Sequence, residues 1–75
     1  MAEVLPGAKP LQPLPDRLRM RAVLMQRGRG NWRVGTGALT VGAIERDLVV
    51  YATEIEAHEA AIRLADRLDL LAVRT

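Results

Sequence analysis

The chain has no cysteine, serine or phenylalanine, and only one histidine, tryptophan, tyrosine and asparagine among its 75 residues. Without cysteine there are no disulfides and no thiolate metal sites, so a reducing cytoplasm is the default expectation. No apolar run approaches the ~18 uninterrupted residues of a membrane span, so we expect no membrane partner. The first residues include a glutamate and a proline in place of a basic region followed by an apolar stretch, so we expect no secretory signal.

These gaps in composition argue against an enzyme. Covalent catalysis needs a nucleophile beside a base, but the only lysine is Lys9 in a proline-rich stretch and the only histidine is His58. A zinc site needs three or four ligands, and Glu54, His58 and Glu59 spread over separate arcs of a predicted helix. We therefore predict no enzymatic activity, no catalytic or metal-binding residues, no cofactor and no small-molecule substrate. We interpret His58 as a structural histidine.

Proline is confined to one end of the chain, within residues 1–16. Proline restricts its own backbone and disfavours helix in the residue before it, so we predict a flexible, extended arm over residues 1–16. The remaining chain is rich enough in apolar residues to fold, since the whole sequence is 49% hydrophobic with a mean hydropathy of +0.03. We predict a single domain over residues 17–75.

Strand signals follow the arm. Residues 17–22 alternate arginine with aliphatic residues, which is typical of a strand with one face in water and the other, through Ala22 and Leu24, in the core. Glycine and asparagine in residues 28–31 predict a turn. On the following strand, Trp32 and Val34 should share the core face and Arg33 the opposite face.

Further strands are predicted beyond that point. We interpret residues 35–37 as a turn and residues 38–44 as a third strand. Neither this turn nor residues 28–33 fit a phosphate-binding glycine loop. Residues 48–52 are the run richest in β-branched side chains, which predicts the central strand of the sheet.

The hydrophobic period changes at Thr53. Thr53 and Glu56 have the spacing of a capping box, so we predict a helix over residues 54–69 whose alanine-rich side packs closely on a sheet. Residues 70–75 are compatible with a short final strand. The expected fold class is α+β: an antiparallel β-meander of three to four strands packed on one C-terminal helix, with room for that final strand.

Arginine is the main chemical signal. Six arginines and no acidic residue lie between residues 17 and 33. Residues up to Arg46 contain eight basic and three acidic residues, a net charge of +5, and the rest contain three basic and six acidic, a net charge of −3. Arginine suits phosphate and guanine contacts. The predicted nucleic-acid-binding residues are Arg17, Arg19, Arg21, Arg29 and Arg33. Alternatively, these side chains are only solvated, or they protect an edge strand from aggregation.

A family resemblance rests on two segments, residues 29–34 (RGNWRV) and residues 53–57 (TEIEA) with the alanine-rich helix that follows. The pattern resembles the arm-binding DNA-binding domains of tyrosine integrases and is similar to the plant ethylene-response-factor type. The resemblance implies a three-stranded sheet that enters the major groove, with contacts from Arg19, Arg21, Arg29 and Arg33. The sequence departs from that family in an uncharged segment 38–44 and one strand too many. A similar skeleton occurs in small uncharacterised bacterial domains.

Two functions remain open from the sequence. One is a non-enzymatic binding module that holds DNA through its arginines. The alternative is a protein-interaction or homo-oligomerisation domain of a small bacterial or mobile-element protein, with no nucleic-acid role. A small domain with one helix leaves a sheet face to be covered, so we expect a homodimer in either case.

Overall fold

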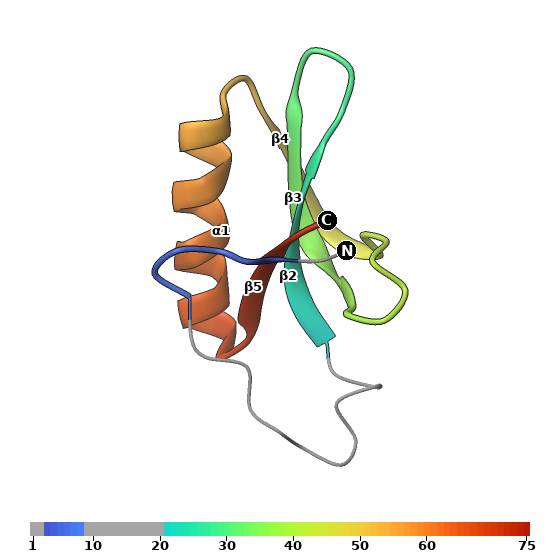
Figure 1. Cartoon of the computed structure of the whole chain (residues 1–75), viewed down its shortest axis with the longest axis vertical. Helices are drawn as coiled ribbons and strands as arrows, with labels where there is room; N and C mark the ends of the chain where they lie inside the picture. The colour runs from blue at the N-terminus through green and yellow to red at the C-terminus, as the bar shows by residue number, and fades with distance from the viewer. Residues whose placement is uncertain (1–2, 9–20) are drawn as a thin grey trace.

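Five strands and one helix make up the fold in the computed structural model, which describes residues 3–8 and 21–75 (Figure 1). In chain order they are β1 (Glu3–Val4), β2 (Arg21–Arg27), β3 (Trp32–Ala38), β4 (Arg46–Tyr51), α1 (Glu54–Leu68) and β5 (Leu71–Arg74). The strands form one sheet in the order β1-β5-β2-β3-β4. Helix α1 packs on one face of it, so the predicted α+β class is confirmed.

The sheet is mixed, which corrects the prediction of three to four antiparallel strands. Strands β2, β3 and β4 form the expected antiparallel meander, but β5 pairs parallel to β2 and antiparallel to β1. The reason is the crossover: α1 carries the chain from β4 at one edge back across the sheet to the far side of β2. The predicted short final strand is therefore present, and it is an inner strand with three buried residues.

Strand β2 is buried on both faces, so the predicted wet face is wrong for the described part of this strand. Val23 and Met25 are 0% and 1% exposed and face the helix, whereas Ala22 and Leu24, both 0% exposed, belong to a cluster on the opposite face. A continuous apolar run is typical of a strand covered on both sides. The alternating part of the pattern, residues 17–20, lies outside the described residues.

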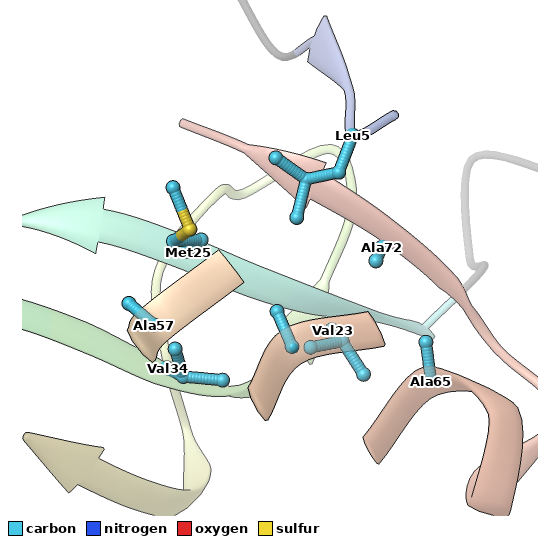
Figure 2. Packing of buried hydrophobic residues seen from close by; sticks show 8 residues of the cluster. Leu5, Val23, Met25, Val34, Ala57, Ala65 and Ala72 are labelled. Carbon is cyan, nitrogen blue, oxygen red and sulfur yellow. The ribbon is translucent and has the colours of Figure 1, made fainter. Parts of the chain in front are cut away.

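The helix confirms the capping prediction. The Thr53 hydroxyl accepts a hydrogen bond from the Glu56 N–H at 3.2 Å and donates one to the Glu56 carboxylate at 2.9 Å. The helix ends at Leu68, one residue before the predicted end, because Asp69 takes a left-handed conformation with φ 57°. Ala57, Ala61 and Ala65 form the buried side of α1. Figure 2 shows Ala57 and Ala65 lying against Val23, Met25 and Val34 of the sheet.

The predicted turn at residues 35–37 and strand at residues 38–44 are wrong. Residues 35–37 lie inside β3, and a loop over residues 39–45 folds back against the second face of the sheet. A Cβ on Gly35 would come within 2.8 Å of the Arg46 carbonyl oxygen, and one on Gly37 would collide with the Ala43 carbonyl. These glycines permit a close approach of backbone to the sheet and do not form a turn.

The predicted central strand, residues 48–52, is also misplaced. Strand β4 lies at the edge of the sheet, and five of its six residues are exposed. Strand propensity measures how well side chains fit a pleated, half-buried surface, and it carries no information about strand order.

Residues 3–8 are the part of the predicted arm that the structure describes, and they lie along the domain. Leu5 is 6% exposed, and its N–H donates to the Ala72 carbonyl at 3.0 Å. His58 has Nε2 2.9 Å from the Pro6 carbonyl oxygen, and since a carbonyl only accepts, the ring nitrogen donates. The flexibility of the arm stays a prediction. In the described part of the chain, no helix is long and apolar enough to cross a membrane.

The packing of the loop on β3 predicts that Gly37→Ala lowers the free energy of unfolding by about 1–3 kcal/mol, since the added methyl group overpacks the contact with Ala43 and Leu24. Urea denaturation followed by circular dichroism measures the loss. Val41→Ala is the control in the same loop: Val41 is 68% exposed, so its truncation should change stability by less than about 0.5 kcal/mol. Wild-type stability in Gly37→Ala would contradict the close contact.

Candidate nucleic-acid interface

The β2–β3 hairpin is the most basic described part of the chain. Arg27 and Trp32 are its last paired residues, and the Gly28 N–H donates to the Asn31 carbonyl at 2.9 Å across the turn. Gly30 has φ +70°, a conformation that glycine adopts without strain. The predicted turn at residues 28–31 is therefore confirmed. Figure 1 shows the tip of this hairpin projecting beyond the N-terminal end of α1.

Trp32 lies at the base of the hairpin tip and is half-buried. It packs against the helix-side core cluster that contains Val34, and Tyr51 is its cross-strand neighbour on β4. Arg33, the next residue, is exposed. The predicted alternation, with Trp32 and Val34 on one face and Arg33 on the other, is confirmed. The indole is nevertheless partly open to solvent at the rim of the sheet.

Two arginines lie beside the indole ring. The guanidinium carbon of Arg74 is 5.0 Å from the centroid of the Trp32 ring, and that of Arg27 is 5.9 Å away. Both distances fall within the range of cation–π attraction. Arg74 also forms an ion pair with Glu54, Nη1 to Oε1 2.9 Å, in which both side chains are about half exposed. Water screens such a pair, so it orients Arg74 more than it stabilises the fold.

The sequence did not single out Arg74. Its approach to Trp32 depends on the parallel pairing of β5 with β2, in which Arg74 lies beside Met25. That pairing joins residues that are far apart in the chain, so no local pattern predicts it. The only available signal was the β-compatible character of residues 70–75.

The predicted binding residues do not all lie together. Arg29 and Arg33 are exposed on the hairpin. Arg21 lies at the opposite end of β2, where its Nη1 is 3.0 Å from Glu45 Oε2 and its Nη2 donates to the Thr36 hydroxyl at 3.3 Å. Arg17 and Arg19 lie outside the described residues. Among residues 3–8 and 21–75, no acidic side chain forms an ion pair with Arg27, Arg29 or Arg33.

No protein-family model matches the chain, and neither a curated protein nor a solved structure is significantly similar to it. Within the described ranges, no group of three or more histidine, aspartate or glutamate side chains could hold a metal ion. The most basic exposed feature of the described surface is the β2–β3 hairpin, with Trp32 half-buried at its base.

The position of Trp32 predicts that Trp32→Ala lowers the free energy of unfolding by about 3 kcal/mol, the lower end for a core tryptophan because the ring is only half-buried. That is a large fraction of the stability of so small a domain. The measurement is urea denaturation monitored by circular dichroism. Arg33→Ala, one residue along on the opposite face, is the control and should stay within about 0.5 kcal/mol of wild type. Equal effects of both variants would argue against this orientation of β3.

Proposed function

We propose that this chain is a non-enzymatic binding module that holds a nucleic acid, with DNA as the first candidate, through its β2–β3 hairpin. The observation that carries the proposal is the projecting tip of the β2–β3 hairpin, with Arg27 and Arg29 at the tip, Arg33 on the adjoining part of β3, and no acidic residue in either strand or in the turn. The major groove of DNA admits a two-stranded ribbon of this kind. Exposed guanidinium groups on the ribbon then reach phosphates or the edges of bases.

The half-buried indole supports a second type of contact. An unpaired base that displaces one of the guanidinium groups beside this ring would stack on it. Arg74 and Arg27 hold positive charge against this ring, 5.0 and 5.9 Å from its centroid, so charge and aromatic surface lie together. This arrangement is the reason to compare duplex with single-stranded substrates.

The proposal keeps the DNA-binding role that the resemblance to integrase arm-binding domains implies, but it moves the main contacts toward the hairpin. Arg29 and Arg33 remain as predicted, with Arg27 added from the same hairpin. Arg17 and Arg19 stay predicted contacts. Arg21 is a weaker candidate because Glu45 already neutralises its guanidinium group.

A protein-interaction role is the second candidate function. It is supported by three neighbouring aliphatic side chains on the edge strand β4, namely Leu48, Val49 and Val50, which are 53%, 49% and 53% exposed. Val50 pairs with Arg33 on β3, so this surface adjoins the hairpin there, whereas Arg27 and Arg29 are not paired with β4.

The first function predicts that Arg29→Glu combined with Arg33→Glu weakens duplex binding by about tenfold or more, because two attractive phosphate interactions become repulsive. Fluorescence anisotropy of labelled duplex and of labelled single strand, each at two salt concentrations, measures the effect. Wild-type affinity should fall steeply with salt. In the variant this dependence should become shallower, by about 0.9 in log–log slope for each duplex phosphate that the protein no longer neutralises.

The matched control is Arg63→Glu combined with Arg67→Glu. Both arginines are exposed on α1, and the double variant changes the net charge by the same amount. It should retain most of the wild-type affinity. Equal losses in the two double variants would mean that only the overall charge matters. Absence of wild-type binding at low salt would remove the nucleic-acid role altogether.

A further inference from the structure

The two edges of the sheet differ in how they are protected. Strand β1 at one edge has only two residues, one of them Glu3, and Pro6 beyond it has no N–H to donate. Strand β4 at the other edge has six residues and, within the described part of the chain, pairs with β3 alone. Short strands, charges, prolines and β-bulges prevent pairing between edges; β4 has a bulge and two charged residues at its start, Arg46 and Asp47, whereas the stretch from Leu48 to Tyr51 has none of these.

The edge strand β4 is also apolar on both faces. Leu48 and Val50 are 53% exposed, and Val49 is 49% exposed. On the helix side, Val49 and Tyr51 line a groove of about 390 Å³ between β4 and α1, whose other walls include apolar Val34 and Leu64 and also charged Asp47, Arg63 and Arg67. An open strand edge with apolar side chains is a template for another strand. Pairing gives the backbone N–H and C=O groups partners and removes the apolar side chains from water.

We infer that β4 pairs antiparallel with β4 of a second copy of this chain, so that two sheets join into one across a twofold axis. The register follows from the β-bulge in β4. Between the pairs Val34–Val49 and Thr36–Arg46, β4 contains one residue more than β3. Asp47 lies in this segment and has φ 58°. The bulge interrupts a regular ladder, which limits new pairing to residues 48–52. The centre of that range is Val50.

A second copy fits this edge because the strand is complementary to itself. With Val50 on the axis, each Val50 faces the other, Val49 faces Tyr51 of the second copy, and Leu48 faces Ala52. No charged side chain enters the ladder, and aliphatic and aromatic cross-strand pairs are favourable ones. Residues that face each other across the axis lie on the same face of the joined sheet. Val49 and Tyr51 are on the helix side, so both helices lie on that side, and the two grooves meet there.

This dimer is independent of the proposed nucleic-acid function. The twofold axis reverses the strand direction, so the tips of the two β2–β3 hairpins point to opposite ends of the joined sheet, and Arg33, which pairs with Val50, lies one strand away from the axis. Val50 variants place a charge beside Arg33, so duplex binding is tested with Arg29→Glu, whose position in the turn is not paired with β4. Sedimentation tests the dimer and anisotropy tests the hairpin, so either can fail without the other.

The test replaces Val50, the residue on the twofold axis, with a positive charge in one variant and a negative charge in another. The wild-type chain should sediment as a dimer at micromolar concentration, whereas Val50→Lys and Val50→Glu should each weaken the dimer by about tenfold or more, because like charges then face each other. An equimolar mixture of the two variants should restore a dimer. Val41→Lys is the control, since Val41 is 68% exposed in the β3–β4 loop, and it should remain dimeric.

Three results would overturn the inference: a monomeric wild type, a dimer unaffected by Val50→Lys, or a mixture that stays monomeric. Circular dichroism verifies that the variants keep their helix. If a variant loses it, hydrogen exchange of the wild type decides the question, because pairing requires slow exchange of the β4 amides that point away from β3. Fast exchange at those amides contradicts the dimer.

Discussion

The burial of β2 on both faces is the constraint on which the rest of the structure depends. A single strand contributes Val23 and Met25 to one side and Ala22 and Leu24 to the other, all of them 0–1% exposed. Both faces of the sheet must therefore be covered, and residues 3–8 and 21–75 provide one helix for this purpose. On the first side, three alanines of α1 bring the helix close to the sheet. On the second side, the β3–β4 loop covers the sheet with Leu39 and Ile44.

Each covering needs small residues at the point of contact. The alanine side of α1 lets the helix lie near β2. Gly37 leaves room on β3 for the loop backbone at Ala43, and Gly35 leaves room for the Ile44 side chain and the β4 backbone at Arg46. Larger side chains at these positions would separate the layers and expose the apolar residues of β2. The same small residues that look like weak structural signals in the sequence are the ones that make a two-sided core feasible in a small domain.

The surfaces available for function are what this arrangement leaves uncovered. Helix and loop together cover the middle of the sheet, so the hairpin tip and the outer edge of β4 remain accessible. They differ in chemistry: the hairpin has exposed Arg27, Arg29 and Arg33, of which Arg27 lies 5.9 Å from the half-buried indole, whereas the edge has adjacent aliphatic side chains. A polyanion suits the first surface and an apolar strand suits the second, which is why we assign them different partners.

Local features were determined by the sequence itself. Four confirmed features depend only on neighbours within a few residues: the capping box at Thr53, the alanine face of α1, the turn at residues 28–31 and the alternation at Trp32. Other features depend on contacts between distant segments: the strand order, the parallel pairing of β5, the edge position of β4 and the approach of Arg74 to Trp32. Only the tertiary structure decided these features, because strand propensity and periodicity describe a residue's own face and say nothing about which strand will lie beside it.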